Sequence, residues 1–248
     1  MKKVLKKPQV INYYFMVCKP LHEKRTKPLY NTVIRRIKEC GDNFYLLGGF
    51  EPIDELPVIK VCDFDDYHSC VEKIESVFKK DWDDADWHII CDDDTFVHTE
   101  NLNSFINKLS KDNLRIYCSQ LYEDSVGIFG GAGILMNNKT FKLIQKFVIE
   151  NGWKENRHFQ SHSDIALSQM CYRLNRTLKA ANKENDKIYV SNPKKMYSFN
   201  HDTMKKNQKL INVKEDLITV HIKDMQYIWT DFNEQECPYQ SLENAFCR

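Results

Sequence analysis

The stretch WHIICDDDTFV, residues 87–97, carries the strongest structural signal in this sequence, because a short apolar run leads directly into three consecutive aspartates. We predict a buried strand over residues 86–91, with Asp92, Asp93 and Asp94 at its carboxyl end. In open α/β sheets, ligands bind outside the carboxyl ends of the strands. The triplet therefore stands where a binding site is expected.

The segments around this strand alternate between strand-like and helix-like patterns. On the amino-terminal side we predict strands over residues 10–17, 43–47 and 58–64, and helices over residues 30–40 and 67–79. On the other side we predict strands over residues 115–118 and 216–222. Three helices are expected there, capped at their starts by Thr99, by Asn137 or Asn138, and by Ser163, with Gly152 ending the second. This alternation predicts an α/β fold, a mostly parallel sheet with helices on both faces.

The composition excludes several classes of protein. The chain has 248 residues, with 36 basic and 35 acidic side chains and a formal net charge of +1. This balance does not favour nucleic acid or an anionic membrane as a partner. No apolar run reaches the ~20 residues that a membrane span requires, and we expect a cytosolic enzyme. The nine cysteines include no CxxC pair, which argues against a structural zinc site and favours reduced thiols.

The acidic triplet predicts a metal site. Adjacent carboxylates repel one another unless a cation or hydrogen-bond donors compensate their charge. Divalent cations prefer such oxygen ligands and often bridge a carboxylate to substrate phosphates. The alternative is a solvated acidic turn, as we expect for the acidic residues at 81–86. Phosphatases and nucleases also place aspartates at strand ends, so the triplet alone leaves the reaction open.

Three further segments contain candidate site residues. The run FGGAGIL, residues 129–135, is either a tight turn or a place where the backbone approaches a ligand closely. Asp164 lies near a predicted helix start, where an ionised aspartate is a competent general base or an ordinary helix-start residue. His221, in ITVHI, is a core histidine or a metal ligand, and His201 is its rival.

Taken in order, four segments resemble the fringe-like β1,3-glycosyltransferases, most closely the core 1 β1,3-galactosyltransferase branch. They are DDADWHIICDDDTFVHTENL, FGGAGILMNNKTF, SDIALSQMC and ITVHIKDMQYI, and the resemblance spans about residues 67–228. It implies a single GT-A domain over residues 1–248, with a Rossmann-like sheet flanked by helices. Residues 1–95 would form the nucleotide-binding half and residues 96–248 the acceptor-binding half.

The resemblance also implies an activity and assigns roles to residues. The activity is inverting transfer of a hexose or N-acetylhexosamine from a UDP-sugar to an acceptor hydroxyl, with a β1,3 linkage. The acceptor would be a glycan, a glycoprotein or a small molecule, and the cofactor Mn²⁺, with Mg²⁺ as the alternative. The implied roles are metal binding for Asp94 and His221, donor binding for Asp92, Asp93, Gly130, Gly131 and Gly133, and base catalysis for Asp164. Ser163 and Ser168 depart from the family pattern, which leaves the acceptor open.

Two other functions stay open from the sequence. A catalytically inactive module of the same fold would bind glycans or nucleotide sugars without turnover. A metal-dependent phosphoesterase would also place aspartates at strand ends.

Overall fold

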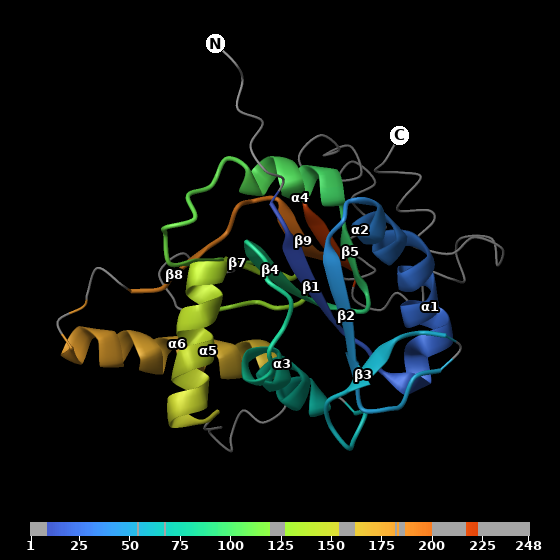
Figure 1. Ribbon diagram of the computed structural model, residues 1–248, viewed down its shortest axis with the longest axis horizontal. Coiled ribbons are helices and arrows are strands. Elements are labelled where there is room, and N and C mark those ends of the chain that lie inside the picture. The colour runs from blue at the N-terminus through green and yellow to red at the C-terminus, as the bar shows by residue number, and fades with distance from the viewer. Residues whose placement is uncertain are drawn as a thin grey trace, which may run out of the picture.

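The computed structural model describes residues 9–53, 55–66, 68–119, 127–153, 162–181, 183, 187–199 and 217–222. These residues form two sheets flanked by helices (Figure 1). The larger sheet has seven strands in the order β3-β2-β1-β4-β7-β6-β8. Its strands are β1 (Ile11–Met16), β2 (Asn43–Gly48), β3 (Val58–Lys60), β4 (Trp87–Asp92), β6 (Arg115–Tyr117), β7 (Ile134–Asn137) and β8 (Tyr189–Ser191).

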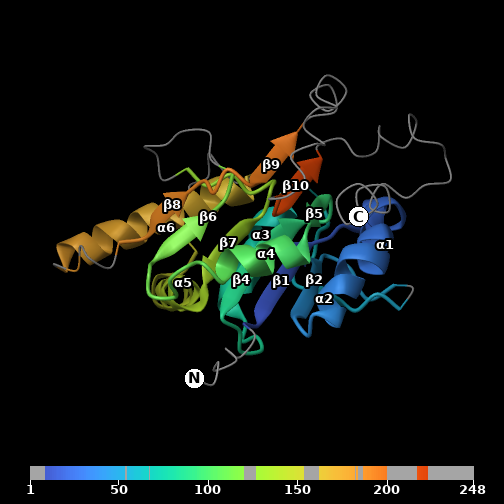
Figure 2. The same cartoon turned by 90° about the horizontal axis from the view of Figure 1, so that it is seen from above.

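The predicted α/β class and mostly parallel sheet are confirmed. Strands β3, β2, β1 and β4 are mutually parallel, and β8 is parallel to β6. Strand β7 runs antiparallel to both of its neighbours, β4 and β6. The smaller sheet consists of β5 (Thr95–Val97), β10 (Thr219–Ile222) and β9 (Met196–Phe199), which Figure 2 shows side by side.

Helices cover both faces of the large sheet. The α-helices are α1 (Lys27–Leu29), α2 (Arg35–Glu39), α3 (Ser69–Lys79), α4 (Thr99–Ile106), α5 (Asn138–Asn151) and α6 (Ser163–Ala180). Apolar residues of α1, α2, α4 and the small sheet form one core, and those of α3, α5 and α6 form the other. None of the helices in the described ranges combines the length and hydrophobicity needed to cross a bilayer.

Strand β1, which lies between β2 and β4, is almost continuously apolar because it is buried on both faces. Ile11, Tyr13 and Phe15 pack in one core, whereas Tyr14 and Met16 pack in the other. A strand buried on both faces loses the alternation of polar and apolar residues that a half-exposed strand keeps.

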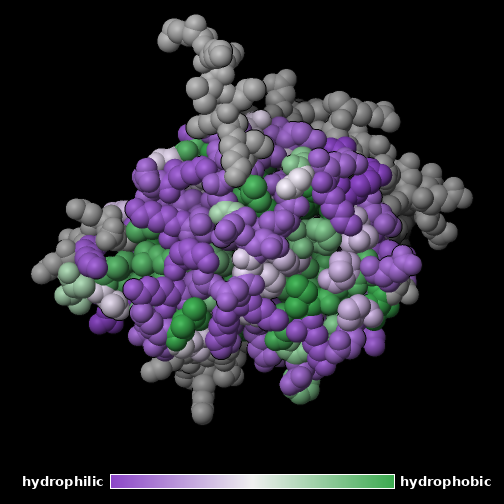
Figure 3. Space-filling view, viewed as in Figure 1, coloured by the Kyte–Doolittle hydropathy of each residue, from purple (hydrophilic) through white to green (hydrophobic). Residues whose placement is uncertain are grey.

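The face of the molecule shown in Figure 3 is mostly hydrophilic, with apolar residues in separate patches.

Several predicted boundaries differ from the observed ones. The helix predicted over residues 30–40 belongs to a helical run that begins at Lys19–Leu21, a 3₁₀ turn, and continues through two π-helical segments, His22–Thr26 and Tyr30–Ile34. Pro20 occupies the first turn of this run, where a backbone N–H has no partner within the helix, so its absence in proline costs nothing. The third predicted strand ends at Lys60, four residues early.

Two predicted helix caps are wrong by one residue. His98 caps α4, because its Nδ1 accepts a hydrogen bond from the Asn101 N–H, and Thr99 is already helical. Ser163 is likewise the first residue of α6 and does not precede it.

The caps of α5 are confirmed. The Asn137 side chain accepts a hydrogen bond from the Thr140 N–H at 2.8 Å. Gly152 ends the helix with φ +68°, a conformation that favours glycine.

Candidate active site

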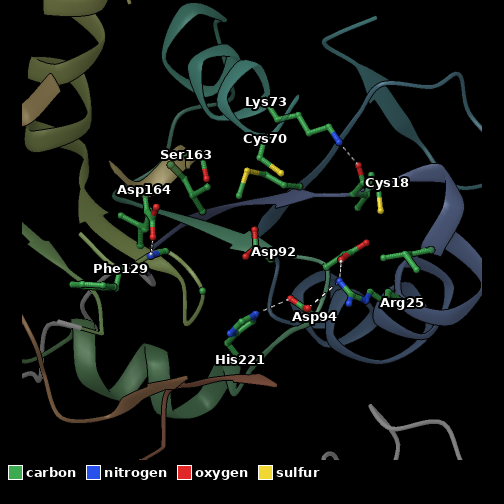
Figure 4. A pocket seen from close by; sticks show the side chains of 18 of the residues that line it. Cys18, Arg25, Cys70, Lys73, Asp92, Asp94, Phe129, Ser163, Asp164 and His221 are labelled. Carbon is green, nitrogen blue, oxygen red and sulfur yellow. Dashed lines mark hydrogen bonds and ion pairs between the residues drawn. The ribbon is translucent and has the colours of Figure 1, made fainter. Parts of the chain in front are cut away.

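A cavity of about 820 Å³ opens at the carboxyl ends of β1 and β4 (Figure 4). Its walls come from the ends of these strands, the π-helical segment His22–Thr26, the start of α6 and β10. The glycine turn, residues 130–133, forms part of the wall next to α6. The triplet therefore lies where a ligand of an open α/β sheet is expected.

The aspartates of the triplet have different surroundings. Strand β4 ends at Asp92, which is half-buried, while Asp93 and Asp94 are buried in the turn before β5. Burial and the neighbouring Asp94 carboxylate raise the pKa of both Asp92 and Asp93 to about 7. This increase reflects the cost of gathering like charges in a dry site, a cost that a bound cation would relieve.

Strand pairing brings His221 to the triplet. Strand β10 runs antiparallel to β5, with His221 opposite Thr95, the residue that follows Asp94. The Nε2 atom of His221 lies 3.2 Å from Oδ1 of Asp94. Burial lowers the pKa of His221, but the Asp94 carboxylate outweighs this effect and the net pKa is raised.

Asp92, Asp94 and His221 fit a divalent cation. Each offers one ligand atom, and these three atoms lie within 4.8 Å of one another. Oδ1 of Asp94 is buried and faces Nε2 of His221, and a cation bound between these two atoms would take the place of their ion pair. Such an oxygen, facing an imidazole nitrogen, is typical of a metal ligand.

Arg25 is a site residue that the sequence did not reveal. It lies in the segment His22–Thr26, and its Nη1 is 2.9 Å from Oδ2 of Asp94 and 3.4 Å from Oδ1 of Asp93. Burial raises the pKa of Asp94, but His221 and Arg25 hold it below its usual value. Nothing local distinguishes Arg25 from Lys24 and Lys27 beside it, so only the folded chain identifies it.

The glycine turn connects Asp164 to the metal-binding group. Oδ2 of Asp164 accepts a hydrogen bond from the Gly130 N–H at 3.2 Å, and Oδ1 accepts one from the Ile165 N–H at 2.8 Å. A Cβ on Gly131 would lie 2.7 Å from Nδ1 of His221. Gly133 has φ +89°, so the segment is both a tight turn and a close approach to the site.

A largely buried ion pair between Lys73 and Asp65 lies at another part of the cavity wall. The Lys73 ammonium donates to the Val17 carbonyl at 2.8 Å and to Oδ1 of Asp65 at 2.6 Å. Asp65 also accepts hydrogen bonds from the backbone N–H groups of Lys19 and Gly49. These contacts join the loops that follow β1, β2 and β3.

Some of the other candidates play no part in the described cavity. Four aromatic residues, Trp153, Tyr197, Tyr227 and Trp229, could on sequence grounds either stack on a sugar ring or belong to the core. Trp153 packs in the core, with its ring centroid 6.2 Å from that of Phe78. His201, Tyr227, Trp229 and the side chain of Tyr197 lie outside the described residues.

No protein-family model matches this chain. Among solved structures, it is similar to a glycosyltransferase involved in the glycosylation of the major capsid of PBCV-1. That match has 13% sequence identity and a TM-score of 0.46, and it covers 87% of this chain and 93% of the other.

Two galactosyltransferase structures are also similar to the chain. One is Drosophila β-1,4-galactosyltransferase 7 with manganese, UDP-Gal and xylobiose, with 12% identity, a TM-score of 0.40 and coverage of 74% and 65%. The other is the galactosyltransferase LgtC with donor and acceptor sugar analogues, with 12% identity, a TM-score of 0.45 and coverage of 94% and 93%. Each TM-score is below 0.5, so these likenesses concern the course of the chain and not its function.

Proposed function

We propose that this protein is a metal-dependent glycosyltransferase of the GT-A type, which moves a sugar from a UDP-sugar to an acceptor hydroxyl. One observation carries the proposal. Asp92, Asp94 and His221 converge at the end of a central strand, beside a cavity of about 820 Å³ that Asp164 also lines. A cation site and a separate carboxylate in one cavity are the two groups that such a transfer needs.

The metal residues account for departure of the nucleotide. A divalent cation held by Asp92, Asp94 and His221, with Mn²⁺ preferred to Mg²⁺, would neutralise the diphosphate and stabilise UDP as it leaves. The backbone of Gly130, Gly131 and Gly133 would lie along the donor sugar.

Asp164 is the proposed base. Its carboxylate is oriented by the Gly130 and Ile165 N–H groups, and its place in the first turn of α6 puts it at the positive end of the helix dipole. The ionised carboxylate would take the proton of the acceptor hydroxyl as that oxygen attacks the anomeric carbon. Attack from the face opposite the diphosphate gives inversion, and the resemblance to fringe-like enzymes supports a β1,3 linkage.

A panel of UDP-sugars, tested with and without Mn²⁺, examines the proposal directly. A ligand present at about 100 times its Kd stabilises the folded state by roughly 2.7 kcal/mol, so the correct donor should raise the melting temperature only when Mn²⁺ is present. Without an acceptor, the enzyme should release UDP only slowly, by transfer of the sugar to water, and an acceptor should accelerate that release. Asp94→Asn should abolish the Mn²⁺ dependence, whereas Asp112→Asn, an exposed aspartate outside the cavity, should preserve it.

The two alternatives predict different outcomes. A phosphoesterase would hydrolyse simple phosphoesters and would not be protected by UDP. A binding module would take up Mn²⁺ and a UDP-sugar without releasing UDP to any acceptor or to water.

A further inference from the structure

Arg25 is the one arginine that lines the cavity within the described part of the chain. Its side chain is 17% exposed. Burial lowers its pKa, but Asp94 and Asp93 outweigh that effect, and the net pKa lies above the usual value. Like any arginine, Arg25 is charged at neutral pH.

The contacts of Asp94 divide between its two oxygens. Arg25 faces Oδ2 at 2.9 Å, and His221 faces Oδ1 at 3.2 Å, so Asp94 lies between the two side chains (Figure 4). A cation bound through Oδ1 would share this carboxylate with the guanidinium. A diphosphate on that cation would then arrive next to Arg25.

The charges of the site also favour a second role for Arg25. A diphosphate that arrives beside the acidic triplet needs a nearby cationic side chain in addition to the metal. Among the described lining residues, the other lysine or arginine side chain is that of Lys73, which is only 2% exposed and is held by Asp65 and the Val17 carbonyl. A guanidinium carries five N–H donors, and the contacts with Asp93 and Asp94 are made by Nη1.

We propose that Arg25 is a further donor-site residue, which orients Asp94 for the cation through one edge and binds the nucleotide's diphosphate through its remaining N–H groups. This inference rests on the proposed function. Arginine suits both tasks, because its planar fork matches carboxylate and phosphate geometry.

Nucleotide binding by Arg25→Gln and Arg25→Lys tests this inference. The dissociation constant of UDP would be measured by calorimetry with saturating Mn²⁺, that of uridine by ligand-observed NMR, and that of Mn²⁺ alone by electron paramagnetic resonance. Arg36→Gln is the matched control, because Arg36 pairs with Glu100 at 3.5 Å outside the cavity. Melting curves would show that each variant is folded.

Loss of a charged hydrogen bond should weaken UDP binding by Arg25→Gln by about 10- to 100-fold, while uridine binding stays within about twofold. Arg25→Lys should recover part of the UDP affinity because it keeps the charge. Unchanged UDP affinity in Arg25→Gln, or an equal loss for UDP and uridine in both variants, would overturn the inference while leaving the proposed function intact. If the wild-type protein bound no UDP with Mn²⁺, the proposed function itself would fail, and the inference with it.

Discussion

Gly131→Ala places a methyl group directly against the imidazole that we assign to the metal. The new Cβ would lie 2.7 Å from Nδ1 of His221, whereas ordinary contacts begin at 3.4 Å, so the ring must move by about 0.7 Å. The Gly131 backbone has little room to retreat, because its carbonyl accepts a 2.7 Å hydrogen bond from the Thr95 hydroxyl. Gly131 is not among the glycines with positive φ, so alanine brings no backbone strain of its own.

The displacement exceeds what a metal site tolerates. Ligand distances in real sites hold to within about 0.2 Å, and disturbing the groups that orient a ligand costs roughly 10- to 100-fold in metal affinity. We expect Gly131→Ala to weaken Mn²⁺ binding by at least about tenfold, measured from the spectrum of free Mn²⁺ during titration. A folded variant with wild-type Mn²⁺ affinity would refute the assignment of His221 as a ligand.

Gly130→Ala is the matched comparison. Its Cβ would lie 3.2 Å from Cβ of Asp164 and contacts no metal-binding side chain. We expect this variant to bind Mn²⁺ normally while sugar transfer slows, because the carboxylate of Asp164 is displaced.

Three further predictions concern the base and two buried groups. Asp164→Asn should slow transfer by about 10²- to 10⁴-fold in steady-state assays while calorimetry shows unchanged Mn²⁺ and UDP binding; a parallel loss of UDP affinity would contradict the role of a base. Lys73→Met removes the cation that faces the partly buried carboxylate of Asp65 and should lower the free energy of unfolding in urea by about 1.5–3 kcal/mol, whereas Lys146→Met, in an exposed pair, should change it little. Burial lowers the pKa of His88 to about 4 in the folded protein. As the pH falls, the His88 imidazole is therefore protonated in the unfolded chain before it is protonated in the folded one. The free energy of unfolding should decrease as the pH falls from about 6.5 to about 4. Relative to His88→Gln, the wild type should lose roughly 3 kcal/mol in acid unfolding curves across that window, and identical curves would show that His88 does not titrate in this way.

Local sequence determined most of the secondary structure and one part of the site. The apolar run before Asp92 specifies a buried strand. Because the triplet directly follows that run in the sequence, it must lie at the carboxyl end of the strand. Asn137 and Gly152 mark the two ends of a helix through contacts with residues three or four positions away. Such local contacts can be predicted from the sequence without knowledge of the fold. Four short strands, β5, β7, β8 and β9, are not predicted, because strands of only three or four residues carry too little periodicity.

Tertiary structure alone decided which groups meet the triplet. His221 reaches Asp94 because β10 pairs with β5, and Arg25 reaches it because the helical run after β1 turns back over the strand ends. The resemblance to a family had suggested His221, but no local pattern separates it from a core histidine, and none marks Arg25 among its basic neighbours. The physical reason is that pairing between distant strands depends on the energy of the whole packed chain, whereas helix caps and strand periodicity depend on neighbours in sequence.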